Sequence, residues 1–212
     1  MHRFSEQTLK SIPNYITYGR VIVIPLVVWL LINPTPLEQW LALLLFILAG
    51  ISDLVDGFLA RKFGAVSDFG KLLDPLADKV LIIAVLVMLT SLRHPTYGDS
   101  WVPAWMVVAV AAREVWVTGL RGLAAQGGVI VPASSSGKWK TVIQMVAVGA
   151  LILNDLPISI LGVNLTAQIF GLNLLLLSLI FSYVSAFDYT VRVLYASHEK
   201  KEDHSEGERG VH

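Results

Sequence analysis

Apolar runs of about 20 residues recur along the chain, and they limit its possible folds more than any other sequence feature. Helices of that length are what the hydrocarbon core of a bilayer requires. Proline, glycine and asparagine mark the breaks between the runs. With 55% hydrophobic and only 15% charged residues, the sequence predicts an all-α, polytopic integral membrane protein. The six expected transmembrane helices are residues 14–33, 38–62, 72–92, 101–126, 138–155 and 166–195.

The two ends of the chain differ from this pattern. In residues 1–12, apolar side chains alternate with charged ones, which predicts a short amphipathic helix lying on the membrane interface. Residues 197–212 are polar and charged, and we expect a disordered tail there. The sequence therefore predicts one membrane domain over residues 1–196.

Net charge and cysteine content exclude several classes of function. The formal net charge is zero, so no general attraction to nucleic acid is expected. The chain has no cysteine, which rules out disulfides and thiolate metal sites.

The distribution of lysine and arginine between alternate loops predicts the orientation, because cytoplasmic loops carry the excess of positive charge. Arg93 alone falls on one side. The other side holds Arg3, Lys10, Arg61, Lys62, Lys71, Arg121, Lys138, Lys140, Arg192, Lys200 and Lys201. We therefore expect a multi-pass protein of the cytoplasmic membrane with both termini on the cytoplasmic side.

Four aspartates interrupt the apolar pattern at this expected cytoplasmic boundary. Asp53 and Asp56 are spaced i, i+3, and Asp74 and Asp78 are spaced i, i+4, so each pair would share one helix face. A single aspartate is usually structural, and Asp74 before Pro75 could simply cap a helix. Four in this pattern favour a functional site, since ionisable residues in membrane segments are costly.

Carboxylates brought close together repel one another unless cations bind between them. Oxygen ligands without soft ligands indicate Mg²⁺, Mn²⁺ or Ca²⁺. Pairs of such ions clamp phosphates in many phosphoryl-transfer sites. The aspartates therefore predict a divalent metal site that acts on a phosphate.

Small residues lie among the first two aspartates. Gly57 and Ala60 could form a helix-packing face, but a packing face would not contain carboxylates. Small side chains let a ligand approach the helix backbone, and Arg61 on the same stripe could pair with a phosphate oxygen.

The complete string D-x2-D-G-x2-A-R-x8-G-x3-D-x3-D, residues 53–78, resembles the signature of the CDP-alcohol phosphotransferase family at every fixed position. The resemblance implies six membrane helices over the whole chain, a cytoplasmic site and a homodimer. It also implies that Asp53, Asp56 and Asp74 bind two divalent cations, Mg²⁺ or Mn²⁺. Asp78 would be the general base beside these metals, and Gly57, Ala60, Arg61 and Gly70 would accommodate the CDP moiety.

Shorter strings resemble the members of that family that use glycerol 3-phosphate as acceptor. They are Asn14-Tyr15-Ile16-Thr17 with Arg20, Arg113-Glu114, and Gly137-Lys138-Trp139-Lys140-Thr141 with Gln144. Asn14 and Thr17 would contact CDP, although either could equally cap the first helix.

Arg113, Lys138 and Lys140 are the candidates for binding the acceptor phosphate. Arg113 and Glu114 could instead be an ion pair, although adjacent helix positions do not face each other. Lys138 and Lys140 could be ordinary positive anchors at a membrane boundary. An arginine deep in a span favours a basic pocket for an anionic acceptor.

The resemblance thus implies a transfer of the phosphatidyl group from CDP-diacylglycerol to glycerol 3-phosphate. The alternatives that stay open are other acceptors, namely inositol phosphate, serine or phosphatidylglycerol. Two other classes, a membrane prenyltransferase and a divalent-cation transporter, fit less well. Prenyltransferase motifs lack the G-x2-A-R continuation, and a transporter would carry its carboxylates near the middle of the membrane.

Overall fold

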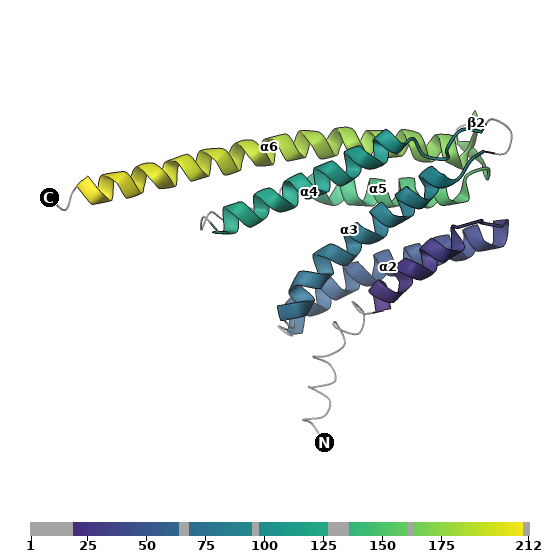
Figure 1. Cartoon of the computed structure of the whole chain (residues 1–212), viewed down its shortest axis with the longest axis horizontal. Coiled ribbons are helices and arrows are strands. Elements are labelled where there is room, and N and C mark those ends of the chain that lie inside the picture. Colours follow the sequence, from purple (N-terminus) through teal and green to yellow (C-terminus); the bar gives the residue numbers. More distant parts are fainter. Residues whose placement is uncertain (1–18, 64–67, 95–97, 127–135, 161–162, 210–212) are drawn as a thin grey trace, which may run out of the picture.

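The structure is a bundle of long helices with a small β-hairpin at one end (Figure 1). This computed structural model describes residues 19–63, 68–94, 98–126, 136–160 and 163–209. Within them, the backbone alone is described for residues 53–63, 68–78, 136–139, 160, 163–164 and 197–209. The expected interfacial helix over residues 1–12 lies outside the described residues, as do Asn14 and Thr17.

The described helices follow the expected apolar segments closely. The chain runs through a helix over Gly19–Leu30, then α2 (Pro36–Phe63), α3 (Asp68–Ser91), α4 (Ala104–Gln126), α5 (Ser136–Leu153) and α6 (Ala167–Arg209). α5 is central, because it packs on α2, α3 and α6. α6 also packs along α4, and α3 packs along α4. Side chains such as Phe46, Leu86, Leu151 and Leu175 fill the space between the helices and are fully or almost fully buried.

Local sequence explains where α2 begins. Thr35 precedes Pro36, whose missing N–H costs nothing in a first helical turn. The Thr35 N–H donates to Glu38 Oε2 at 2.6 Å, and the Glu38 N–H donates to Thr35 Oγ1 at 3.4 Å. This reciprocal capping box places the helix start two residues before the expected one.

The fold is mostly helical, as expected, but the connection between α5 and α6 contains a short hairpin where the sequence indicated only a break between helices. Strands β1 (Pro157–Ile160) and β2 (Val163–Thr166) pair antiparallel, with Pro157 opposite Thr166. Apolar and polar residues alternate along the strands, and several of them are β-branched, which favours a hairpin over an irregular loop. Asn154 ends α5 with φ 44°, in the left-handed region where asparagine is tolerated.

The C-terminal segment also differs from the expectation. α6 continues to Arg209, so residues 197–209 are helical where we expected a disordered tail. Figure 1 shows this end of α6 extending beyond the other helices. The segment contains glutamate and lysine, which are good helix formers, and has no proline. Continuing an existing helix also avoids the cost of nucleation.

Among the described residues, one helix is long and apolar enough to cross a membrane. Ala167–Ala196, in α6, has 30 residues and a mean hydropathy of 2.0. The other apolar helical stretches are shorter: Gly19–Leu30, Pro36–Ser52, Lys79–Ser91 and Lys140–Leu153. Six membrane spans therefore stay a prediction.

Candidate active site

The aspartate motif occupies two consecutive helices. Asp53 and Asp56 lie in the last three turns of α2, together with Gly57, Ala60 and Arg61. Gly70, Asp74 and Asp78 lie in the first three turns of α3. These residues belong to the part described by its backbone alone, so the predicted metal and CDP contacts stay predictions.

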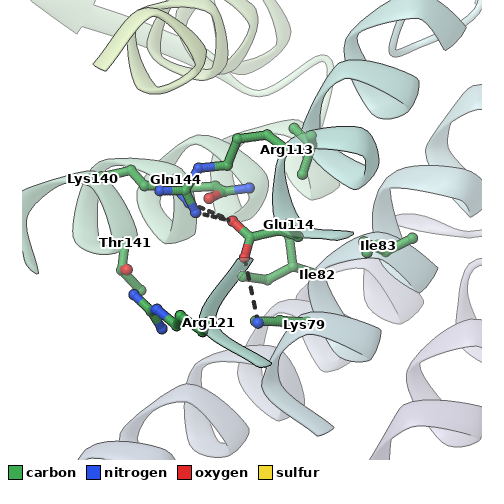
Figure 2. A pocket seen from close by; sticks show the side chains of 10 residues that line it. Lys79, Ile82, Ile83, Arg113, Glu114, Arg121, Lys140, Thr141 and Gln144 are labelled. Atoms are coloured by element: carbon green, nitrogen blue, oxygen red, sulfur yellow. Dashed lines mark hydrogen bonds and ion pairs between the residues drawn. The ribbon is translucent and has the colours of Figure 1, made fainter. Parts of the chain in front are cut away.

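A cluster of charged side chains begins directly after the motif and can be described in full. Glu114 on α4 is at its centre (Figure 2). Its Oε1 accepts hydrogen bonds from Lys140 Nζ on α5 and, at 2.8 Å, from Arg113 Nη1. Its Oε2 lies 3.8 Å from Lys79 Nζ on α3. One carboxylate thus joins cations from three helices.

These charged groups are largely removed from solvent. The exposed fraction of the side chain is 8% for Lys140, 10% for Arg113, 16% for Glu114 and 26% for Lys79. Burying a charge without a partner is costly, whereas paired charges offset part of that cost. The pairing explains how three cations can lie inside an apolar bundle.

The cluster lines a cavity of about 170 Å³. Figure 2 shows Arg121 and Thr141 on its rim and Ile82 and Ile83 on its α3 side. Among the described lining residues, four side chains are cationic and one is a carboxylate: Lys79, Arg113, Arg121, Lys140 and Glu114. These five residues together carry a formal charge of three positive, which suits a small anion.

Further hydrogen bonds hold two of the cations. Arg113 Nε donates to the main-chain oxygen of Ser182 on α6 at 3.3 Å. Lys79 Nζ donates to Thr118 Oγ1, and Thr118 Oγ1 in turn donates to the main-chain oxygen of Glu114 at 2.7 Å. Both cations are therefore fixed by α4 or α6 as well as by the Glu114 carboxylate.

The structure brings two of the three candidate acceptor residues together, Arg113 and Lys140. The Lys138 side chain lies outside the described ones. The argument that Arg113 and Glu114 cannot face each other is wrong, because they form an ion pair at 2.8 Å. Their Cβ atoms diverge, but the long arginine side chain bends back to the carboxylate.

Sequence reasoning missed Lys79 and Arg121 as lining residues. A signal for Arg121 exists, because Glu114, Thr118 and Arg121 follow i, i+4, i+7 spacing on one helix face. Lys79 directly follows Asp78, so its position beside the aspartate motif could have indicated it. Arg121 also lies over the ring of Tyr189 on α6, 5.7 Å from its centroid.

Comparison with known proteins assigns this arrangement to a family. Residues 10–187 match the sequence profile of the CDP-alcohol phosphatidyltransferases. The chain belongs to this family. The match covers the aspartate motif, the cavity and most of the helical bundle, so the resemblance seen in the sequence is confirmed.

Curated relatives within the family carry a more specific name. The chain is 38% identical over 164 residues to a protein of Bacillus subtilis, covering 72% of this chain and 81% of the relative. It is 38% identical to a protein of Rickettsia bellii, covering 76% and 84%, and 36% identical to one of Haemophilus influenzae, covering 67% and 75%. All three are named CDP-diacylglycerol–glycerol-3-phosphate 3-phosphatidyltransferase.

Proposed function

We propose that this protein transfers the phosphatidyl group from CDP-diacylglycerol to glycerol 3-phosphate, giving phosphatidylglycerol phosphate and CMP. The names of its relatives support this reaction. The observation that carries the proposal for the acceptor is the cavity whose described lining residues are net positive, beginning at Lys79 directly after the aspartate motif. A phosphate monoester carries about two negative charges at neutral pH, so it requires such a pocket.

The position of Asp78 supports its role as general base. Asp78 is four residues before Ile82, which lines the cavity, so the two positions share a face of α3. An acceptor whose phosphate occupies the cavity would therefore place its hydroxyl toward Asp78. Asp78 takes the proton of the glycerol 1-hydroxyl. That oxygen forms a bond to the phosphatidyl phosphorus, the bond from this phosphorus to the CMP oxygen breaks, and CMP leaves.

The donor set fits two hard divalent cations, Mg²⁺ or Mn²⁺. Asp53, Asp56 and Asp74 would hold them, since these ions prefer carboxylate oxygens and the described part of the chain offers no competing cluster of metal ligands. When bound, such ions neutralise the charge of a pyrophosphate and of its leaving group. Gly57, Ala60, Arg61 and Gly70 would line the CDP site, with Asn14 and Thr17.

The surface of the bundle supports a membrane location. Large apolar side chains are exposed along its helices, including Trp29, Leu44, Val115, Phe181 and Phe187. A soluble monomer rarely exposes so much apolar surface, whereas lipid covers it at no cost. We propose six spans, with both termini and the site on the cytoplasmic side, and a homodimer as implied by the family.

One assay separates this function from its rivals. Purified protein is offered labelled CDP-diacylglycerol with Mg²⁺ and, in parallel, glycerol 3-phosphate, inositol phosphate, serine or phosphatidylglycerol. We expect phosphatidyl transfer to glycerol 3-phosphate with release of CMP. Conversion of another acceptor alone would refute the proposed substrate but retain the family chemistry. Transport of divalent ions into sealed vesicles without any phosphatidyl transfer would refute the proposal that the protein is an enzyme.

A further inference from the structure

Glu114 stands out among the described residues that line the cavity. Of the described residues that line the cavity, Glu114 is the one carboxylate. A site for a phosphate would gain from having no carboxylate, because the two negative charges repel each other. The presence of Glu114 at the centre of the cations therefore needs a physical reason.

The contacts of Glu114 supply that reason. Lys140, Arg113 and Lys79 approach one carboxylate from α5, α4 and α3. Without a shared counter-ion the three like charges would repel one another strongly in the poorly solvated interior. Their long side chains could then turn away from the cavity toward water. The carboxylate keeps them together before any substrate arrives.

We propose that Glu114 is a positioning residue, which holds Lys79, Arg113 and Lys140 turned toward the cavity so that the acceptor phosphate meets a preassembled set of donors. The inference rests on the proposed function, because it takes the acceptor phosphate as the occupant of the cavity. Preassembly lowers the cost of ordering the side chains on binding. The charged residues among the described lining carry three net positive charges, which would compensate the charge of a phosphate monoester.

Glu114→Gln tests the inference, because it keeps the size of the side chain and removes its charge. We expect the KM for glycerol 3-phosphate to rise about ten-fold or more, as for the loss of charge-assisted contacts. The KM for CDP-diacylglycerol and kcat should change much less. Glu114→Asp, which keeps the charge on a shorter side chain, should recover part of the affinity. If the KM for glycerol 3-phosphate falls in Glu114→Gln, the carboxylate merely repels the acceptor and the inference is overturned.

A double-variant cycle with Lys140→Gln shows whether Glu114 acts through the cations. If it does, the double variant should lose clearly less than the product of the two single losses, because residues that act as a unit are not additive. Some further loss over Lys140→Gln is expected, since Glu114 also pairs with Lys79 and Arg113. If the increases in KM of the two single variants instead multiply in the double variant, the inference is overturned. Asp155→Asn is the matched control, since it removes a carboxylate that pairs with His94 at 3.1 Å. It lies about 22 Å from Lys140 along α5, and its kinetics should match the wild type.

Binding measurements separate this inference from the proposed reaction. Titration of the detergent-solubilised protein with glycerol 3-phosphate and with inorganic phosphate, followed by calorimetry, needs no turnover. We expect saturable binding to the wild type that weakens about ten-fold in Glu114→Gln, measured at a temperature where both proteins are folded. The melting temperature of Glu114→Gln should be lower, because three buried cations lose their shared counter-ion. If the wild type binds the phosphate but transfers no phosphatidyl group, the proposed reaction fails and the role of Glu114 stands. Equal affinity of the two folded proteins, or no saturable binding, would overturn the inference.

Discussion

Arg113 Nε on α4 donates to the main-chain oxygen of Ser182 on α6, 3.3 Å away across the helix interface. Its Nη1 donates at the same time to Glu114 Oε1 at 2.8 Å. A guanidinium can make both contacts because its donors lie in a rigid planar fork. Arg113 therefore links the α4–α6 interface to the cavity, and its orientation is set by the bundle itself.

The first prediction concerns this double contact. Arg113→Ala should raise the KM for glycerol 3-phosphate more than the KM for CDP-diacylglycerol. The loss of a charge-assisted hydrogen bond costs about 1.5–3 kcal/mol, or roughly ten- to a hundred-fold in affinity. Arg113→Lys should restore little of the affinity for glycerol 3-phosphate, because a single ammonium group cannot replace the planar guanidinium in both of its contacts. Steady-state kinetics with each substrate varied in turn provide the measurement.

Arg192→Ala is the control for these variants. Arg192 is exposed on α6 and pairs with Asp188 at 3.0 Å, one turn away. Exposed ion pairs contribute little, so its kinetics should stay within about two-fold of the wild type. Equal losses for Arg113→Ala and Arg192→Ala would show that general surface charge, and not the cavity, binds the acceptor.

The second prediction concerns the carboxylates of α2 and the start of α3. Asp53→Asn, Asp56→Asn and Asp74→Asn should each lose nearly all activity, since each removes a charged ligand of a divalent cation. EDTA should abolish the activity of the wild type, and added Mg²⁺ or Mn²⁺ should restore it. Full turnover in excess EDTA would contradict the metal site.

The third prediction concerns Asp78. Asp78→Asn should retain CDP-diacylglycerol binding but lose turnover, because the amide cannot accept the proton. The loss of a general base typically costs about 10²–10⁴-fold in kcat. Single-turnover measurements with saturating substrates report this step directly. A higher KM with kcat unchanged would instead identify Asp78 as a binding residue.

The fourth prediction concerns orientation in the membrane. The chain has no cysteine, so single cysteines can be labelled without background. Gln126 ends α4 and Asp155 follows α5, and both are exposed at opposite ends of the bundle. In intact cells, a membrane-impermeant thiol reagent should label Asp155→Cys but not Gln126→Cys. The reverse result would overturn the proposed topology and the cytoplasmic site.

The fifth prediction tests the packing of α5 on α6. A Cβ added at Gly171 would lie 2.7 Å from Leu151 Cγ and 2.9 Å from the main-chain oxygen of Ala147. The backbone cannot move away easily, so Gly171→Ala should destabilise the protein by about 1–3 kcal/mol. Gly50→Ala is the comparison, because its new Cβ would meet chiefly the flexible end of Met145. Thermal unfolding in detergent should show the larger loss for Gly171→Ala.

Local patterns predicted most of the helices, since apolar runs and helix breakers are properties of neighbouring residues. Four of the expected segments correspond to α2 to α5 within a few residues, and a fifth matches the start of α6. The pattern missed the hairpin of β1 and β2, whose few residues read as a connection. It also missed the extension of α6, because a polar composition suggests disorder even where a helix is already nucleated.

The family and the order of the aspartates could be read from the sequence, because the eight fixed residues of the motif all lie within residues 53–78. The sequence also supplied Arg113 and Lys140 as candidates. The packing of the helices revealed that Lys79 joins them and that Glu114 lies between all three. Lys79, the Arg113–Glu114 pair and Lys140 are far apart in the chain, and helix periodicity specifies the face of a helix but not the partner on which it packs. Packing α3 and α5 against α4 creates the cavity, and the burial of its charges makes the Glu114 carboxylate necessary.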